Sequence, residues 1–221
     1  MHGQAEVSMR PRLTWVLAHL VLFALGAWLT IGGGIATANF VPGDPARQVV
    51  LAVFGAVLWL RMTFMALRLL RRRFGWEEAV AVTAAVAIYQ IVFAAIGAAQ
   101  QEALGWLDGV GIVLFVLGSA MNTGAETQRR RFKRDPAHVG QLYTGGLFGF
   151  VRHPNYLGDV LWVSGWALVA GGPGLLVVPL GLAIAFLTYF IPTLSTYLRQ
   201  RYGEAYVAWS ARTPRLIPWL Y

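Results

Sequence analysis

The hydrophobic pattern of the chain consists of six long apolar runs separated by short polar segments. An α-helix needs about 20 apolar residues to cross a hydrocarbon core of about 30 Å, and most of the runs are close to that length. The fourth and fifth runs are shorter and are expected to continue into the membrane interface. The runs are Leu13–Ile31, Val49–Leu69, Ala79–Ala98, Trp106–Asn122, Asn155–Ala170 and Leu175–Tyr197. The pattern predicts an all-α polytopic membrane protein of about six transmembrane helices, forming a single integral membrane domain over residues 1–221.

The basic residues of the loops predict the orientation of these helices. Of the 18 lysines and arginines, 16 lie before the first run, after the second, after the fourth or after the sixth. Because basic loops stay in the cytoplasm during membrane insertion, we expect these segments and both termini to be cytoplasmic. Arg47 lies in an opposite loop, and Arg61 lies inside the second run. Topogenic charge explains the cluster Arg71–Arg73 as well as a binding role does.

Composition narrows the classes of function. Hydrophobic residues make up 57% and charged residues 13% of the 221 positions, whereas roughly 25% of the residues of a soluble domain are charged. The net charge of +8 suits a nucleic acid or a membrane surface, and the hydropathy decides for the membrane. We therefore expect membrane lipids and a lipophilic small molecule as partners, and no nucleic acid. The richness in Ala, Gly, Val and Arg favours a bacterial inner membrane, and the oligomeric state stays open.

The absence of cysteine excludes further chemistry. Disulfides, thiolate zinc sites, iron–sulfur ligation and a cysteine nucleophile all require that residue. No other grouping of residues predicts a metal site.

The first polar segment follows the fourth apolar run. If the helix continues past the membrane, one quarter of its circumference carries an amide, a carboxylate and several cations, since successive residues are ~100° apart. These residues are Asn122, Glu126, Arg129, Arg130 and Lys133. Arg131 points the other way. The set suits a ligand that has a hydrogen-bonding head and phosphates, although anionic lipid and the helix C-terminus explain the arginines equally well.

The second polar segment, Gly145–Asp159, leads into the fifth run. Its glycines allow a close approach to a ligand, and Pro154 is suited to the first turn of a helix. Asn155, Asp159, Trp162 and Trp166 are spaced to form one stripe from the cytoplasmic surface inward. A carboxylate one turn inside a membrane helix is costly without a partner, so Asp159 is a candidate site residue, while the two indoles fit either a site or simple packing.

The remaining polar residues lie deep in the membrane, just before the third run, or after Tyr197. Tyr89 is midway along the third run, and Arg61 is too far from the helix end to reach the surface comfortably. Tyr89 can donate a proton to a developing enolate while Arg61 stabilises the charge, or both can be satisfied polar groups between helices. Glu77 and Glu78 fit the first turn of a helix. The aromatic and basic residues after Tyr197 suit an interfacial anchor or a lid over a cofactor.

Three motifs together resemble the steroid 5-alpha-reductase C-terminal domain superfamily, which includes sterol reductases. They are Asn-x3-Glu-x-Gln-x3-Phe-Lys-x2-Pro at 122–136, Gly-Leu-Phe-x3-Arg-His-Pro-Asn-Tyr-Leu-Gly-Asp at 146–159, and Tyr-Gly-Glu-x-Tyr at 202–206 followed by Thr-Pro-Arg-Leu-Ile-Pro. The resemblance covers residues 109–221. It implies NADPH as the cofactor, bound from the cytoplasm by this region, with residues 1–108 on the substrate side. The implied cofactor-binding residues are Asn122, Glu126, Arg129, Arg130, Lys133, Arg152, His153, Asn155, Tyr156, Asp159, Tyr197 and Tyr206.

The expected activity is NADPH-dependent reduction of an activated carbon–carbon double bond in a lipophilic enone that is steroid-, sterol- or isoprenoid-like. The isoprenylcysteine carboxyl methyltransferases share the Arg-His-Pro motif and use S-adenosylmethionine, so methyl transfer to a lipid-soluble acceptor is the alternative. The methyltransferases have a Glu-Glu pair where this chain has no acid in residues 195–201. The steroid reductases have a tyrosine where this chain has Trp59, and a Gln-Glu pair that no membrane run supplies. A non-catalytic protein of the same fold is the third reading.

Overall fold

The computed structural model describes residues 9–31, 41–70 and 74–218, and within these ranges the regular elements are all helical. This confirms the predicted all-α class. The basic cluster Arg71–Arg73 and the extreme ends of the chain lie outside the described residues. The orientation of the helices in the membrane stays a prediction.

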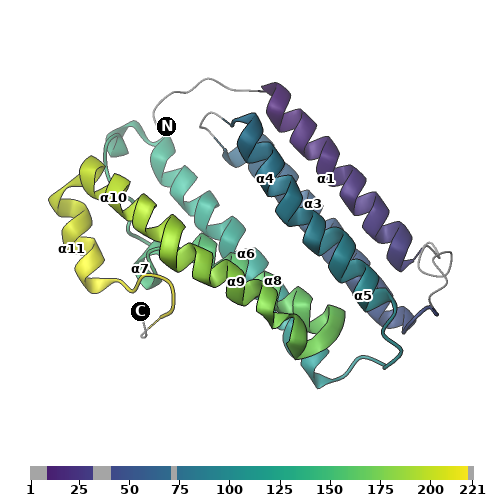
Figure 1. The fold of residues 1–221 in the computed structure, drawn as a ribbon. Coiled ribbons are helices and arrows are strands. Elements are labelled where there is room, and N and C mark those ends of the chain that lie inside the picture. Colours follow the sequence, from purple (N-terminus) through teal and green to yellow (C-terminus); the bar gives the residue numbers. More distant parts are fainter. Residues whose placement is uncertain (1–8, 32–40, 71–73, 219–221) are drawn as a thin grey trace. The chain divides into compact units, whose positions relative to one another are not determined.

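The first part of the chain contains the N-terminal apolar runs (Figure 1). Its elements are α1 (Met9–Thr30), α3 (Pro45–Phe64), the π-helical turn η1 (Met65–Leu69), α4 (Trp76–Ala87), the π-helical turn η2 (Ile88–Phe93), α5 (Ala94–Ala98) and α6 (Trp106–Arg134). Helix α6 has 29 residues, a length of about 43 Å at 1.5 Å per residue, so it extends beyond a 30 Å core. The expected continuation of the fourth helix is confirmed.

The second part of the chain contains the last two apolar runs. Its elements are the 3-10 turn η3 (Pro136–His138), α7 (Leu147–Phe150), α8 (Pro154–Gly171), the 3-10 turn η4 (Gly172–Leu176), α9 (Val177–Ala185), the π-helical turn η5 (Phe186–Phe190), α10 (Ile191–Tyr202) and α11 (Glu204–Arg212). Pro154 opens α8, as predicted. Pro192 lacks the N–H that would continue the helical bonding, which accounts for the wider turn η5 just before it.

Five helical segments of the described ranges are long and apolar enough to cross a membrane. They are Met9–Thr30, Pro45–Leu69, Trp76–Ala98, Trp106–Arg134 and Pro154–Tyr202. The last segment has 49 residues and contains both the fifth and the sixth predicted helices. The chain turns between them at Gly172, whose φ of +73° favours glycine (Figure 1). The protein is therefore an all-α polytopic membrane protein.

The helices form two compact units. Unit 1 comprises the described residues up to Ile112 together with Gly165–Leu175, and unit 2 comprises Val113–Ser164 with the described residues from Leu176 onward. The second half of α8 thus packs with the N-terminal helices, which the sequence did not reveal. Whether unit 1 serves the substrate and unit 2 the cofactor stays a prediction.

Unit 1 is held together by close helix contacts and by a polar network. A Cβ added to Gly26 would lie 2.2 Å from the carbonyl oxygen of Gln90, so α1 and η2 meet backbone to backbone. Gln90 itself donates from Nε2 to the carbonyl oxygen of Gly55 at 3.0 Å. The opposite face of α1 exposes Leu17 and Val21, as expected for a surface in contact with lipid.

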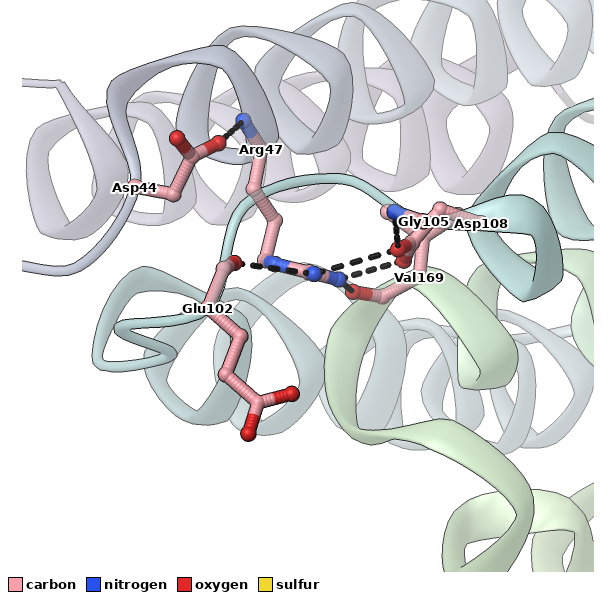
Figure 2. A network of polar contacts seen from close by, with 6 residues as sticks. All are labelled: Asp44, Arg47, Glu102, Gly105, Asp108 and Val169. Atoms are coloured by element: carbon pink, nitrogen blue, oxygen red, sulfur yellow. Dashed lines mark hydrogen bonds and ion pairs between the residues drawn. The ribbon is translucent and has the colours of Figure 1, made fainter.

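The polar network lies where α3 and α6 begin (Figure 2). Asp44 caps α3 by accepting from the backbone N–H of Arg47 at 2.8 Å. The Arg47 guanidinium forms an ion pair with Asp108 and donates to the carbonyl oxygens of Val169, at 2.6 Å, and Glu102, at 3.2 Å. Both charged side chains are less than 10% exposed. This network joins the start of α3, the start of α6 and the end of α8 within unit 1.

Candidate functional site

The centre of the candidate site in unit 2 is a hydrogen-bonded group between α6 and α8. Asn122, which is buried, donates from Nδ2 to Asp159 Oδ1 at 2.8 Å and to the carbonyl oxygen of Asn155 at 3.1 Å. Trp162 Nε1 donates to the same Asp159 oxygen at 2.8 Å. The predicted polar stripe of α8 therefore joins the predicted polar face of α6. Trp166 belongs to unit 1, where its ring packs edge-on against Phe54.

Glycines allow the two helices to approach this closely. A Cβ on Gly158 would lie 2.7 Å from the backbone nitrogen of Asn122, and one on Gly118 would lie 2.4 Å from the backbone nitrogen of Trp162. Either substitution would push the helix backbones apart. The close crossing explains how short side chains such as Asn122 and Asp159 reach each other.

The C-terminal turns of α6 carry the predicted cations, and at least two of these are engaged by other residues of the protein. Arg129 forms an ion pair with Glu126 at 2.5 Å, with the Arg129 side chain 53% exposed. Lys133 Nζ donates to the carbonyl oxygen of Gln141 and to the hydroxyl of Tyr202, the latter at 3.1 Å. Two of the expected phosphate ligands are therefore engaged with the protein itself.

Two neighbouring arginines of α6 differ in burial. Arg130 is partly buried, whereas Arg131 is exposed. Gln128 lies between Glu126 and these arginines in the sequence. Its side chain accepts from the backbone N–H of Leu147 at 3.0 Å and so fixes the start of α7. Gln128 is part of the motif at 122–136, but the spacing of that motif alone predicts no role for it.

The Arg-His-Pro turn before α8 is fixed by the C-terminal tail. The backbone N–H of Arg152 donates to the carbonyl oxygen of Pro214 at 2.8 Å. His153 is 2% exposed and stacks on Tyr156, with ring centroids 5.5 Å apart. Burial, reinforced by the positive charges of Arg152 and Arg215, lowers the pKa of His153 to about 4. The imidazole is therefore neutral near pH 7 and can act as a hydrogen-bond donor or acceptor, not as a cation.

The C-terminal helix α11 folds back from the end of α10 and packs on the protein (Figure 1). Tyr206 and Trp209 are buried in a cluster with Ala125 and Phe148. Trp209 Nε1 also donates to the carbonyl oxygen of Phe148 at 3.0 Å. Of the two interpretations of the tail, these contacts favour a cover over α7 and the adjoining turn of α6, because the aromatic rings face protein. Tyr197, on α10, accepts a hydrogen bond from Arg201 at 2.8 Å.

Three polar atoms around this turn and tail are buried without a hydrogen-bond partner in the described structure. They are Arg152 Nε, His153 Nε2 and the hydroxyl of Tyr206. Buried polar atoms of native proteins are nearly always paired with protein, water or a ligand. Neutral and cationic donors next to further arginines suit an anionic or hydrogen-bonding ligand. Among the described residues no group of three or more His, Asp or Glu side chains is placed to hold a metal ion.

The two predicted catalytic residues lie in unit 1. Tyr89 is 7% exposed in the turn η2, with its ring 6.4 Å from that of Trp166 and 5.8 Å from that of Phe93. Arg61 is partly buried in the last turns of α3. All twelve predicted cofactor-binding residues lie in unit 2. No contact described here tests the chemical role of either set, so these roles stay predictions.

Known proteins of two enzyme classes are similar to the chain. Residues 78–213 match the model of a family of proteins of unknown function, DUF1295. The chain is 32% identical over 130 residues to a Delta(14)-sterol reductase of Mus musculus, covering 49% of this chain and 30% of that protein. This similarity confirms the resemblance to the steroid reductase superfamily.

Methyltransferases are similar to the chain as well. It is 37% identical over 95 residues to a probable O-methyltransferase of Ustilaginoidea virens, covering 41% of this chain and 32% of that protein. It is 27% identical over 125 residues to a protein-S-isoprenylcysteine O-methyltransferase of Arabidopsis thaliana, covering 52% and 61%. The chain thus spans less than two thirds of the length of these relatives.

Proposed function

Because the chain belongs to the DUF1295 family and is similar to both sterol reductases and methyltransferases, we propose that it is a membrane reductase. It uses NADPH to reduce an activated carbon–carbon double bond in a lipophilic enone. The observation that carries the proposal is the set of buried, unpartnered polar atoms of Arg152 and His153, in the turn before α8, and of Tyr206, on α11. A polar ligand can supply the partners that these atoms lack.

The residues of unit 2 fit the parts of a dinucleotide. Arg130 and Arg152 supply positive charge for phosphate groups, for which arginine offers a planar set of donors. His153, neutral at pH 7, and Tyr206 supply hydrogen bonds to ribose or amide groups. Asn122 and Asp159 fix the crossing of α6 and α8 behind them. NADPH, when bound, supplies a hydride.

The overall reaction is balanced with one hydride and one proton. A hydride added to the β carbon of an enone moves the double-bond electrons toward the carbonyl oxygen as an enolate. A proton at the α carbon then completes the saturated ketone, and NADPH becomes NADP⁺. Within the chain, Tyr89 is our candidate for proton donation and Arg61 for stabilising the enolate charge. A lipophilic substrate is expected because unit 1 exposes apolar helix faces such as that of Leu17 and Val21.

A second candidate function is methyl transfer from S-adenosylmethionine to a lipid-soluble acceptor. One structural observation favours it: Arg129 and Lys133 are engaged with Glu126 and with Gln141 and Tyr202. Fewer cations are then available for the phosphates of NADPH, and S-adenosylmethionine has none. The similarity to methyltransferases supports the same alternative.

Thermal unfolding of the purified chain separates these candidates, because a ligand that binds only the folded state raises the melting temperature. We expect NADPH to raise it more than S-adenosylmethionine does. A larger effect of S-adenosylmethionine would transfer the assignment to the methyltransferase. If neither ligand stabilises the protein, the non-catalytic interpretation replaces both. The variant Arg152→Gln, which removes a charge beside the unpartnered atoms, should lose most of the NADPH effect.

A further inference from the structure

Helix α1 buries a histidine in unit 1 whose ring makes no hydrogen bond within the described structure. His19 is 1% exposed, and both of its ring nitrogens are buried without a partner. A neutral imidazole has one donor and one acceptor, and leaving a buried polar group unpaired costs about 1–3 kcal/mol. His19 is not among the predicted site residues. The ring therefore indicates a polar ligand inside unit 1.

Three neighbouring side chains on α1 and α3 have the same property. The indole nitrogens of Trp15 and Trp59 and the hydroxyl of Thr63 are buried and have no partner. Several helical hydroxyls of the described residues bond to the carbonyl oxygen four residues earlier, as Thr30 does to Gly26 at 3.0 Å and Ser164 to Val160 at 2.7 Å. Because Thr63 does not make this bond, its hydroxyl is available to a ligand.

The register of α1 against α3 follows from two contacts. Arg12 Nη1 donates to the carbonyl oxygen of Ala66 at 3.4 Å. Further along α1, the ring of Phe23 stacks on Trp59 with centroids 6.3 Å apart. The two helices are therefore antiparallel, and each step inward along α1 corresponds to a step back along α3.

This register brings the unpartnered atoms to one level of the helix pair. Counting along the antiparallel helices from the Arg12–Ala66 contact, Trp15 comes level with Thr63, and His19 comes level with Trp59. The rings of Trp15 and His19 are in contact, with centroids 4.6 Å apart. The level lies about 5–10 Å inward from Arg12, at 1.5 Å of rise per residue. Four polar groups thus converge within two turns of an otherwise apolar interface.

The chemistry of the four groups selects the ligand. Indole N–H groups only donate, whereas imidazole and hydroxyl groups both donate and accept, so donors outnumber acceptors. An apolar interior disfavours a charged ligand. We propose that His19, together with Trp59 and Thr63, forms a hydrogen-bonding site for the carbonyl oxygen of a lipophilic molecule. That this molecule is the enone substrate rests on the proposed function. If this site holds the carbonyl oxygen of the enone, its donors, and not Arg61, polarise the double bond for reduction.

The binding of a ketone probe to the purified full chain in lipid nanodiscs tests this site. The probe is a 4-en-3-one sterol labelled with ¹³C at its carbonyl carbon, and the comparator is the same sterol without the carbonyl oxygen. Affinity is measured by quenching of tryptophan fluorescence, and the carbonyl stretch by infrared difference spectroscopy. We expect the ketone to bind about tenfold more tightly than the comparator, the effect of roughly 1.4 kcal/mol from a hydrogen bond, with its stretch shifted to lower frequency.

Variants of the site provide the decisive comparison. His19→Phe keeps an aromatic ring and should abolish both the preference for the ketone and the infrared shift. Trp59→Phe removes a single donor and should reduce both the preference and the shift. It supplies the test if His19→Phe fails to fold. Thr30→Val is the matched control, because it removes a buried hydroxyl of α1 that already has a partner, and it should behave like the wild type. Equal binding of ketone and comparator, or an unchanged preference in both site variants, would overturn the proposal.

The same preparations distinguish failure of this site from failure of the proposed function. The stabilisation by NADPH is measured on the wild type and on His19→Phe, and it should be equal because the cofactor residues lie in unit 2. A carbonyl site that depends on His19 in a protein stabilised only by S-adenosylmethionine would uphold the site and reject the reductase. Stabilisation by NADPH, together with a ketone preference that does not depend on His19, would reject the site and uphold the reductase.

Discussion

Asn122 and Asp159 are joined side chain to side chain across the closest approach of α6 and α8. Asp159 Oδ1 accepts from Asn122 Nδ2 and from Trp162 Nε1, each at 2.8 Å. A carboxylate one turn inside a membrane helix requires such partners. The pair therefore stabilises the helix crossing that positions the Arg-His-Pro turn, whatever ligand that turn binds.

Replacing Asp159 should separate stability from ligand binding. Asp159→Ala removes the shared acceptor of the Asn122 and Trp162 donors, and we expect a loss of about 2–5 kcal/mol in the free energy of unfolding. Asp159→Asn keeps an acceptor oxygen and should lose less. Thermal or denaturant unfolding in detergent measures both. Glu77→Ala, at an exposed position in the first turn of α4, is the control and should change little. Equal losses in Asp159→Ala and Glu77→Ala would show that the network contributes no stability.

The ion pair of Arg47 and Asp108 makes a prediction for unit 1. Arg47→Met leaves Asp108 as a buried, uncompensated charge, which typically costs about 3–5 kcal/mol. The double variant Arg47→Met/Asp108→Leu removes both charges and should recover part of that loss. A double-mutant cycle on unfolding free energies measures the coupling. Independent, additive losses would mean that the two side chains do not act as a pair. Arg10→Met, on an exposed residue, serves as the control.

How far the sequence predicts this structure depends on the range of the interactions involved. Apolar runs and helix starts are local, so the spans, the continuation of α6 and the opening of α8 at Pro154 were all predictable. The stripe from Asn155 to Trp162 was also predictable, because helical spacing fixes it. The partner of that stripe, Asn122, was expected in the same region because both residues carry polar groups at the membrane boundary.

Other features depend on long-range packing that spacing does not encode. The pairing of Arg47 with Asp108 joins two helix ends that are 61 positions apart, and only their opposite charges hinted at it. Lys133 was expected to contact phosphate, yet Tyr202 and Gln141 occupy it, because the tail folds back on α6. His19 gave no signal, since a single histidine in an apolar run is indistinguishable from a satisfied one until its neighbours are known.

The stability of the protein should depend on pH through His153. Its pKa in the folded state is about 4, below the ordinary 6.5, so as the pH falls the unfolded chain takes up a proton before the folded chain does. Stability is therefore full above pH 6.5, declines as the pH falls toward 4, and has lost up to about 3 kcal/mol at that point. Melting temperatures measured between pH 4 and 8 report this decline.

Two histidine variants identify the source of that dependence. In His153→Gln the decline between pH 6.5 and 4 should be smaller than in the wild type, because no group with a lowered pKa remains at that position. His138→Gln changes a partly exposed histidine of η3 that stacks on Phe132, and it should leave the decline intact. An unchanged pH profile in His153→Gln would assign the dependence to other groups.

The basic loops predict the membrane topology of the chain. Reporter fusions at Pro42 and Gln101 should read as external, and fusions after Pro136 as cytoplasmic, because the basic segments lie on the side of Pro136. Alkaline phosphatase and fluorescent-protein fusions give opposite signals on the two sides and so check each other. A cytoplasmic signal at Gln101 would exclude the assigned orientation.

The last prediction concerns how the dinucleotide is held at the end of α6. Arg130 is partly buried while Arg131, its neighbour, is exposed, so of these two residues we expect Arg130 to contact a phosphate that lies against unit 2. We expect Arg130→Ala to weaken NADPH binding about tenfold or more, the effect of a charge-assisted hydrogen bond of roughly 1.5–3 kcal/mol. Arg131→Ala removes the same charge from the adjacent position and should have little effect. Titrations at low and physiological salt measure both variants, and the preference for NADPH over NADH should weaken with salt, since exposed charges are screened over about 8–10 Å. Equal losses in the two variants would show that the arginines act as a diffuse field. In that case Lys133→Ala would be expected to change NADPH binding by releasing Tyr202, its hydrogen-bond partner, and not by removing a contact with a phosphate.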